Sequence, residues 1–384
     1  MEIKKTKFSI VIYAKTNSKH DVDQKLLGLS LLKRQILTAE NLDPENVVVV
    51  KNENDTIPSG RILFINAAYF VHPLALTEIA AGDSFFIEEG GYLAFLDSKT
   101  AANEIKDFLK NGIFKSENTT PPSPGYRVLV DSPEKLKVLS KELFNAMRKP
   151  VDGLVARTLN KAVSFFLTEY VWLPLRFTPN MVTFITVCIG VLSGIFCAGG
   201  TYTYLVIGTF LSHFASILDG CDGEVARLTF KTTTIGKWFD SVGDSIVNTS
   251  LMIGLGYGLE PYFGTLPIII GWSTTAVSWI HNFVSYYDVI VVRKTTDIFA
   301  FTWWFEKKDR VRKIDLSKPV YGTISFLDLL KYFSRRDFYL FIYFVLAVVG
   351  PTAIMFGYIA TAIFLVPSFF LTIAHIYFGI IKKI

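Results

Sequence analysis

Four aspartates stand at helical spacing in two neighbouring segments of an otherwise apolar part of the chain. Asp219 and Asp222 are three residues apart, and Asp240 and Asp244 are four apart. At these spacings each pair lies on one face of a helix. Two helices joined by a short turn would therefore direct all four carboxylates toward one point. The pattern predicts a cluster of hard oxygen ligands.

Such a cluster is costly in an apolar surrounding unless a cation balances it. One aspartate at the centre of a membrane span costs roughly 2.5–3.5 kcal/mol on the insertion scale. The basic side chains close in sequence are Arg227, Lys231 and Lys237. Ligands that are all carboxylates favour Mg²⁺ or Mn²⁺ over zinc. Two such ions about 3.5–4 Å apart suit the displacement of one oxygen at phosphorus by another.

Small residues accompany the aspartates. Gly220, Gly223 and Ala226 recur every three residues, and Gly236 lies on the same stripe as the second aspartate pair. Bare helix faces let helices approach one another closely. They also leave room for a nucleotide to lie against the backbone.

The complete pattern reads Asp219-x-x-Asp222-Gly223-x-x-Ala226-Arg227-x₈-Gly236-x-x-x-Asp240-x-x-x-Asp244. It resembles the signature of the CDP-alcohol phosphotransferase family at every fixed position. At average residue frequencies a given start would match by accident roughly once in 10¹⁰. Upstream, Thr178-Pro179-Asn180-x-x-Thr183 is similar to the segment that opens the first membrane span in that family. The resemblance covers about residues 150–384.

The resemblance implies a role for each matching residue. It implies that two divalent ions are held by Asp219, Asp222, Asp240 and Asp244, and that Asp244 also serves as general base. It implies that the CDP moiety is bound by Asn180, Thr183, Asp219, Gly223, Ala226 and Arg227. The implied reaction moves a substituted phosphate group from a CDP-alcohol to an acceptor hydroxyl and releases CMP. A homodimer is implied as well.

Basic residues near the pattern are candidates for binding an anionic acceptor such as an alcohol phosphate. They are Lys231 and, at the end of the basic stretch Arg293–Arg336, Arg335 and Arg336. The alternative is that these side chains anchor the loops on the cytoplasmic side and contact lipid headgroups. The sequence leaves both interpretations open.

Hydropathy divides the chain into a water-soluble part and a membrane part. Of the 384 residues, 51 % are hydrophobic, and long apolar runs follow Phe177. These runs predict six spans, at 180–199, 203–227, 235–257, 265–292, 338–352 and 354–380. The short loops near Gly200, Pro261 and Pro351 carry no Lys or Arg. The positive-inside rule therefore places the soluble part and the C-terminus in the cytoplasm, at the cytoplasmic membrane.

An N-terminal α/β domain is predicted from β-branched apolar runs that alternate with helical patterns. The expected parallel strands are Phe8–Tyr13, Val47–Val50 and Ile62–Ile65, with a helix around Leu26–Leu37. Further expected elements are a strand at Tyr92–Leu96, a helix through Lys110, a strand at Tyr126–Val130 and a helix at Ser132–Met147. The alternation indicates a doubly wound sheet.

This domain faintly resembles the cytidylyltransferase-like domains fused to some archaeal and bacterial family members that transfer inositol phosphate. In those, a glycine-rich loop after the first strand cradles a triphosphate, but here Ala14-Lys15-Thr16-Asn17-Ser18-Lys19 contains no glycine. The strand Ile62–Ile65 ends in Asn66 where a metal-binding aspartate is expected. We expect the fold without the transferase activity of such domains.

The predicted organisation has three parts. Residues 1–148 form the cytoplasmic α/β cytidylyltransferase-like domain, and 177–384 form the six-helix α-helical membrane domain. Between them, 149–176 is amphipathic and suits a helix in the membrane interface. The alternative for this middle part is a linker helix packed on the soluble domain.

Further features of the sequence bear on function classes other than a transferase. The formal net charge of +5, with no basic stripe interleaved with aromatics, argues against nucleic-acid binding. Cys188, Cys197 and Cys221 lie without ligand spacing and are expected to be buried free thiols. A cation-coupled transporter also keeps carboxylates in a membrane, and a membrane pseudoenzyme or scaffold is the third alternative.

The sequence does not decide which donor and which acceptor the enzyme uses. The donor is CDP-diacylglycerol or CDP-inositol, and the acceptor is an alcohol phosphate such as inositol phosphate or glycerol phosphate. A lipid donor requires a lateral groove between helices, whereas a soluble donor does not.

Overall fold

The computed structural model divides the chain into two compact units, Met1–Ala146 and Met147–Ile384. The residues that it describes are 8–14, 22–71, 76, 86–87, 93–96, 101–112, 114, 127–148, 155–295, 301, 303–304 and 335–381.

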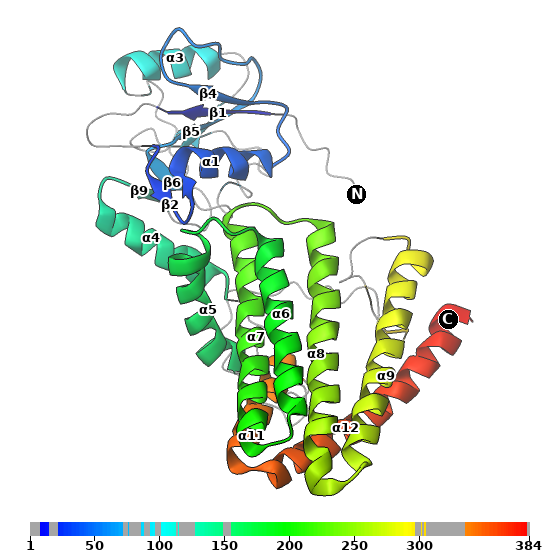
Figure 1. Ribbon diagram of the computed structural model, residues 1–384. Coiled ribbons are helices and arrows are strands. Elements are labelled where there is room, and N and C mark those ends of the chain that lie inside the picture. Colours follow the sequence, from blue (N-terminus) through cyan, green and yellow to red (C-terminus); the bar gives the residue numbers. More distant parts are fainter. Residues whose placement is uncertain are drawn as a thin grey trace, which may run out of the picture. The chain divides into compact units, whose positions relative to one another are not determined.

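The first unit is built on a five-stranded sheet in the order β4-β1-β5-β8-β7 (Figure 1). Its strands are β1 (Ser9–Tyr13), β4 (Val47–Val50), β5 (Ile62–Asn66), β8 (Leu93–Leu96) and β7 (Phe86–Ile87). The three predicted parallel strands are confirmed, because β1 pairs in parallel with both β4 and β5. The strand predicted at Tyr92–Leu96 also exists, but β8 runs antiparallel to β5. The sheet is therefore mixed.

Two helices cover the two faces of this sheet. α1 (Leu31–Glu40) packs with one set of alternating strand residues, among them Ile10, Ile12 and Leu63. α3 (Ala101–Asn111) packs with the opposite set, among them Val11 and Phe64. Strand residues that alternate between the two faces thus supply two cores, as the period of two requires.

The helix predicted at Leu26–Leu37 begins later than expected. β2 (Lys25–Leu26) and β3 (Leu29–Ser30) form a hairpin, and Leu27 and Gly28 between them have positive φ. A two-residue turn of this kind matches the twist of the strands. The Ser30 side chain then accepts a hydrogen bond from the Lys33 amide and starts α1. A hairpin and an N-cap replace the predicted first turn.

The predicted strand at Tyr126–Val130 lies outside the main sheet. β9 (Arg127–Leu129) pairs with β6 (Tyr69–Val71) in a separate two-stranded sheet, and α4 (Pro133–Ala146) follows it. Leu139 of α4 packs with Phe70 of β6 in a small apolar cluster. The helix predicted at Ser132–Met147 is confirmed within one residue at each end.

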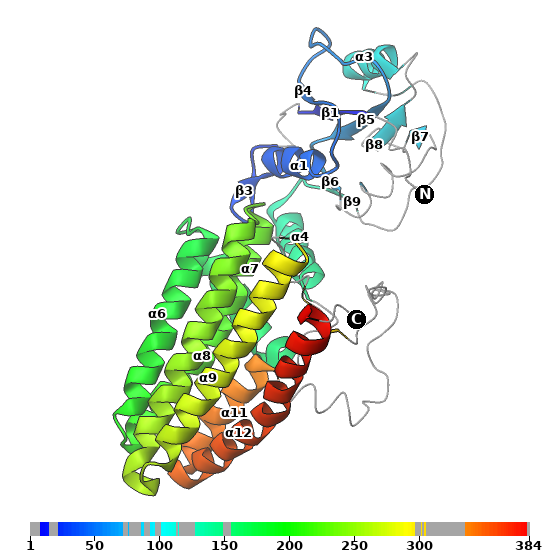
Figure 2. The same ribbon diagram turned by 90° about the vertical axis from the view of Figure 1, so that its right-hand side faces the viewer.

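Long helices dominate the second unit (Figures 1 and 2). They are α6 (Pro179–Ala198), α7 (Tyr202–Leu228), α8 (Thr234–Phe263), α9 (Leu266–Tyr287), α11 (Arg336–Val349) and α12 (Pro351–Ala374). α9 continues as η3 (Asp288–Val292), and α12 as η5 (His375–Ile381). These helices coincide in position with the six predicted spans.

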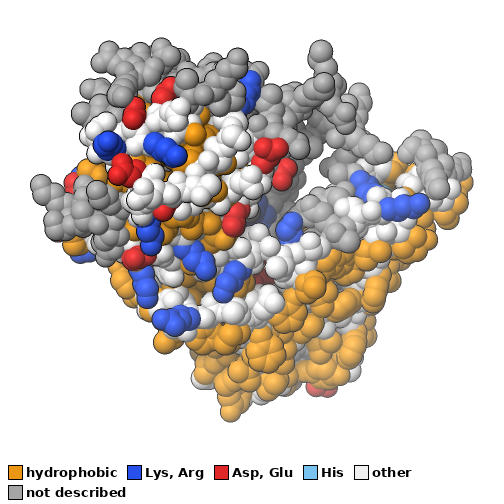
Figure 3. Space-filling view, turned by 90° about the horizontal axis from the view of Figure 1, so that it is seen from above, with side chains coloured by type: hydrophobic (Ala, Val, Ile, Leu, Met, Phe, Trp, Pro, Cys, Tyr) orange, Lys and Arg blue, Asp and Glu red, His pale blue; other side chains and the backbone are white. Residues whose placement is uncertain are grey.

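Three segments in the described part of the chain are long and apolar enough to cross a membrane, namely Pro179–Ala198, Tyr202–Leu228 and Pro351–Ile381. Hydrophobic side chains also gather on part of the surface in Figure 3. Among the exposed large apolar side chains of the long helices are Phe184, Phe283 and Phe356. These findings indicate a membrane protein. The count of six spans stays a prediction.

Of the cysteines, Cys197 and Cys221 are buried as predicted. The prediction of a buried thiol is wrong for Cys188, which is exposed.

Glycines let α6 and α8 lie in close contact. A Cβ atom added at Gly194 would collide with the backbone carbonyl group of Ser250, and one added at Gly254 would collide with the backbone of Gly194. Backbone atoms cannot rotate away from such a clash. The absence of side chains at these positions therefore sets how close α6 lies to α8, the helix that carries Asp240 and Asp244.

Gly194→Val is accordingly expected to separate α6 from α8. We expect it to destabilise the protein by about 1–3 kcal/mol, the usual range for overpacking, measured by thermal unfolding in detergent. The matched control is Leu192→Val, because Leu192 is exposed on the same helix. Equal unfolding temperatures of the two variants would contradict this packing.

Candidate active site

A cavity of about 680 Å³ opens in the second unit among the first turns of α6, α8 and α11, the last turns of α7 and the segment 156–164. Every site residue predicted from the sequence lines it. They are Asn180, Thr183, Asp219, Asp222, Gly223, Ala226, Arg227, Lys231, Asp240, Asp244, Arg335 and Arg336. Residues more than 150 positions apart in the sequence thus meet at one place.

Three of the four aspartates form a compact group. One carboxylate oxygen each of Asp219, Asp240 and Asp244 lies within 4.8 Å of the others. Oδ1 of Asp240 is buried and has no hydrogen-bond partner among the described residues. A buried carboxylate oxygen without a donor is costly in a protein interior. The group therefore fits a bound divalent cation, which would supply the missing positive charge.

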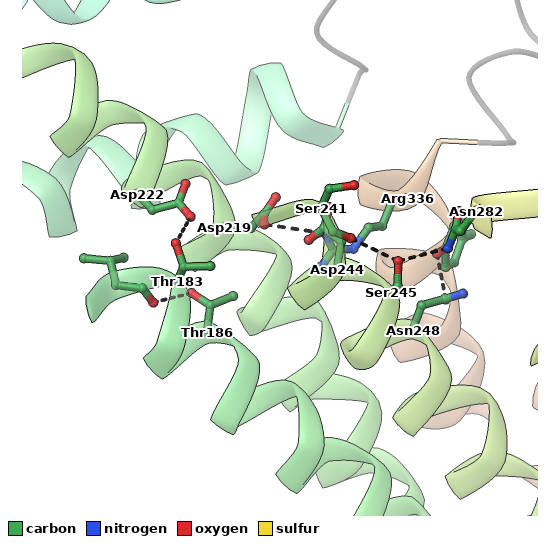
Figure 4. Close-up of polar contacts among 12 residues, drawn as sticks. Thr183, Thr186, Asp219, Asp222, Ser241, Asp244, Ser245, Asn248, Asn282 and Arg336 are labelled. Atoms are coloured by element: carbon green, nitrogen blue, oxygen red, sulfur yellow. Dashed lines mark hydrogen bonds and ion pairs between the residues drawn. The ribbon is translucent and has the colours of Figure 1, made fainter. Parts of the chain in front are cut away.

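Asp222 lies outside that group. Its Oδ2 accepts a hydrogen bond of 2.5 Å from the Thr183 hydroxyl (Figure 4). Residues three apart on a helix differ by about 60° in direction, so Asp222 points away from Asp219. The hydrogen bond from Thr183 of α6 holds the Asp222 carboxylate on the side of the cavity where α6 lies. The expectation that four carboxylates point at one place thus holds for three, with Asp222 one turn away in the same cavity.

Arg336, the first residue of α11, faces the aspartate group (Figure 4). Its Nη1 forms ion pairs with Oδ1 of Asp219, at 3.5 Å, and with Oδ1 of Asp244. The guanidinium therefore neutralises part of the clustered negative charge. Lys231 is exposed in the turn between α7 and α8, and Arg335 is half-buried.

Three helices begin at the cavity, and side-chain capping explains the start of two of them. Thr178 accepts a hydrogen bond from the Met181 amide, with Pro179 as the first residue of α6. Thr233 likewise accepts from the Gly236 amide at 3.0 Å and starts α8. α11 begins at Arg336. Helix N-termini carry partial positive charge and unpaired amides, so this end of the bundle favours phosphate groups.

Glu224 lies inside the signature but was not among the predicted site residues. This side chain is fully buried, and it accepts hydrogen bonds from Lys161 at 2.9 Å, Ser164 at 2.7 Å and Thr168 at 2.7 Å. Its partners lie on a segment about sixty positions earlier, so spacing could not reveal them. Asp337, which lines the cavity beside Arg336, was not among the predicted site residues either.

Two predictions fall partly or wholly on residues that are not described. The glycine-free stretch after β1 includes residues 15–19, and most of the basic stretch between 293 and 336 also lies outside the described residues. Asn66 is described at the end of β5. Its Oδ1 accepts a hydrogen bond from the Ala68 amide at 3.1 Å, so the side chain closes its own turn.

The family resemblance implies that Asp222 binds metal and that CMP is released. On that basis Thr183→Val is expected to lower CMP release about tenfold, the lower end of the effect of removing a partner of a metal ligand. Valine keeps the shape but leaves the Asp222 carboxylate without its hydroxyl donor. The matched control is Thr186→Val, because the Thr186 hydroxyl donates to the Val182 carbonyl of its own helix. If both variants release CMP at the wild-type rate, Thr183 does not orient Asp222.

The sequence profile of the CDP-alcohol phosphatidyltransferases matches residues 176–381, more than half of the chain and all four aspartates. The chain belongs to the CDP-alcohol phosphatidyltransferase family. The resemblance drawn from the aspartate pattern is confirmed, and with it the prediction of an enzyme of the transferase class.

Relatives of this CDP-alcohol phosphatidyltransferase carry the name bifunctional IPC transferase and DIPP synthase. The Aquifex aeolicus protein is 37 % identical over 139 residues, which are 36 % of this chain and 31 % of the relative. The Thermococcus kodakarensis protein is 35 % identical over 147 residues, 37 % of this chain and 33 % of the relative. The chain thus matches about a third of the length of each.

Proposed function

We propose that this CDP-alcohol phosphatidyltransferase moves a substituted phosphate group from a CDP-alcohol to the hydroxyl of an acceptor and releases CMP. Two divalent cations, Mg²⁺ or Mn²⁺, are held by Asp219, Asp222, Asp240 and Asp244. The observation that carries the proposal is the group of three carboxylates from two helices, within 4.8 Å of one another, in a cavity lined by the whole signature.

The residues of the chain divide the reaction among them. Asp244 takes the proton of the acceptor hydroxyl, whose oxygen forms the new bond to phosphorus as the bond to the CMP oxygen breaks. The donor's CDP moiety is held by Asn180, Thr183, Asp219, Gly223, Ala226 and Arg227, near the N-termini of α6 and α8. The metal ions, when bound, supply the positive charge that balances the diphosphate.

An anionic acceptor is bound by Lys231, Arg335 and Arg336. Arg336 supports this assignment, because its guanidinium already lies against two carboxylates of the aspartate group. Planar guanidinium groups bind phosphate through paired hydrogen bonds. An alcohol phosphate such as inositol phosphate or glycerol phosphate is therefore the acceptor that the charge of the cavity favours.

An apolar groove bears on the choice of donor. It has a volume of about 510 Å³ and meets the cavity at Asn180. The other residues that line it belong to the first turns of α6 and α8, namely Met181, Phe184, Ile185, Ile235 and Phe239. A lateral groove is what a lipid donor requires. With this groove, CDP-diacylglycerol is a candidate donor as well as CDP-inositol.

The proposal extends to the organisation of the chain. We assign residues 1–148 to a degenerate cytidylyltransferase-like domain, 149–176 to an interfacial helix and 177–384 to a six-span membrane domain with both termini cytoplasmic. The protein acts at the cytoplasmic membrane as a homodimer. Asn66, which closes its own turn where a metal-binding aspartate is expected, supports the degenerate state of the first domain.

The test is CMP release by the purified protein with Mg²⁺ and inositol 1-phosphate. CDP-diacylglycerol and CDP-inositol are offered in separate reactions, and glycerol 3-phosphate replaces inositol 1-phosphate in a second series. We expect release with one donor. If the protein binds metal and CDP but releases no CMP with any pair, it is a scaffold. Cation flux into vesicles without CMP release would favour the transporter.

A further inference from the structure

The segment Ala156–Trp172 lies beside α7 in the second unit (Figure 1). It consists of η1 (Ala156–Asn160), α5 (Lys161–Leu167) and η2 (Thr168–Trp172). Asn160, Lys161 and Ser164 line the active-site cavity. The segment is thus one wall of the site, and its placement affects what the cavity holds.

One buried carboxylate fixes this wall on α7. Glu224 is 0 % exposed and accepts hydrogen bonds from Lys161, Ser164 and Thr168. The three donors span two helical turns on one face of the segment. A carboxylate withdrawn from water needs this complete set of partners. The contact therefore defines both the distance and the register of the segment on α7.

The other end of the segment contacts α11. The Ala156 amide donates to Oδ2 of Asp337 at 3.1 Å, and the Nε of Arg335 donates to Oδ1 of the same carboxylate at 3.3 Å. The first amides of a helix lack partners within it, so Asp337 uses a donor that the segment offers only at its start. Arg336, the residue before Asp337, reaches Asp219 and Asp244.

These contacts form a closed series that begins and ends on α7. Glu224 of α7 binds the segment, the segment binds Asp337, and the adjacent Arg336 forms an ion pair with Asp219. Asp219 lies on α7, five residues before Glu224. Two helices in an apolar surrounding can pack through apolar side chains alone, and a buried ion pair adds little net stability. The buried charge instead specifies one arrangement.

We propose that Glu224 is a positioning residue of the transferase reaction. It anchors the segment Ala156–Trp172 on α7, the segment fixes Asp337, and Asp337 sets where Arg336 stands in the cavity. This inference rests on the proposed function, in which Arg336 binds the anionic acceptor. The groups that hold the CDP moiety lie on α6 and on α7 itself, whereas Arg336 is linked to Glu224 only through the segment and Asp337. We therefore expect Glu224 to affect binding of the acceptor more than binding of the donor.

The first test compares Michaelis constants for the two substrates, with inositol 1-phosphate as acceptor and the donor that the wild type uses. Glu224→Ala is expected to raise the KM for the acceptor about tenfold and to leave the KM for the donor within about twofold. Ser164→Ala/Thr168→Val, which keeps the charge of Glu224, is expected to shift the acceptor KM in the same direction by less. Glu260→Gln, exposed near the opposite end of α8, is the control.

Equal increases in both KM values, or no change in either, would overturn the proposal. If Glu224→Ala does not fold, the hydroxyl double variant decides by the same criterion. A wild type that releases no CMP contradicts the proposed function instead.

A second measurement does not depend on substrate. Amide hydrogen exchange of the full chain is compared for the wild type, the Glu224 or hydroxyl variant and Glu260→Gln. We expect faster exchange in the variant at residues 156–172 and also in the first turn of α11, with no change in Glu260→Gln. Faster exchange in the segment alone would show that Glu224 does not act on Arg336, and unchanged exchange would show that it does not anchor the segment.

Discussion

Asp240→Asn is expected to lower CMP release by about a thousandfold or more, a loss typical of removing a group that stabilises charge at the reacting centre. Asparagine keeps the volume and removes one charge from the aspartate group. Asp240 has a buried oxygen without a hydrogen-bond partner among the described residues. This oxygen is therefore available as a ligand for a cation. A neutral amide oxygen is a weaker ligand for a hard cation.

The stability of this variant separates chemistry from folding. Clustered carboxylates repel one another, so the metal-free Asp240→Asn protein is expected to unfold at the same temperature as the wild type or higher. Added Mg²⁺ is expected to stabilise it less than the wild type, because the stabilisation by a ligand becomes smaller as its affinity falls. Glu260→Gln on the same helix is the control. Near-normal turnover of Asp240→Asn with metal present would disprove its role as a ligand.

Arg336→Gln is expected to affect both catalysis and the metal-free protein. Without its guanidinium, the acceptor KM should rise by about a hundredfold, because the change removes a charged contact to phosphate worth about 2–3 kcal/mol. The metal-free variant should lose about 1–2 kcal/mol of stability, since Asp219 and Asp244 lose an ion pair that is partly exposed to solvent.

Magnesium then distinguishes the two effects of Arg336. We expect Mg²⁺ to raise the unfolding temperature of Arg336→Gln more than that of the wild type, because the cation no longer competes with a guanidinium for the same carboxylates. Thermal unfolding with and without Mg²⁺ measures this. A variant that is as stable as the wild type without metal, or that gains less from Mg²⁺, would show that the ion pairs do not matter.

The aspartate group was predictable because its information is local. Pairs three and four residues apart on helices fix which side chains share a face, and Thr178-Pro179 marks the start of a helix by itself. Spacing alone could not show that Asp222 turns away from the others. That direction depends on Thr183, which lies on another helix and holds the Asp222 carboxylate.

Contacts between distant segments escaped the sequence analysis. Glu224 is a charged residue at a position that the signature leaves unspecified, and nothing nearby in the sequence marks Ser164 or Thr168 as its partners. In the first unit, apolar runs predicted the strands correctly, but an apolar run does not encode direction, so the antiparallel β8 was not foreseen. α1 starts late because Leu27 and Gly28 adopt positive φ in a turn. The prediction followed the helical spacing of the apolar residues and did not anticipate this turn.

The central claim is that metal held by the aspartate group supports transfer of a substituted phosphate. The most direct measurement follows CMP and the phosphorus-containing product together by ³¹P NMR, with purified protein, donor and acceptor, as Mg²⁺ is titrated. We predict one CMP for each new phosphodiester, no reaction without divalent metal and none with Asp240→Asn. CMP formed without the phosphodiester, or a rate that Mg²⁺ and Asp240 do not change, would contradict the account.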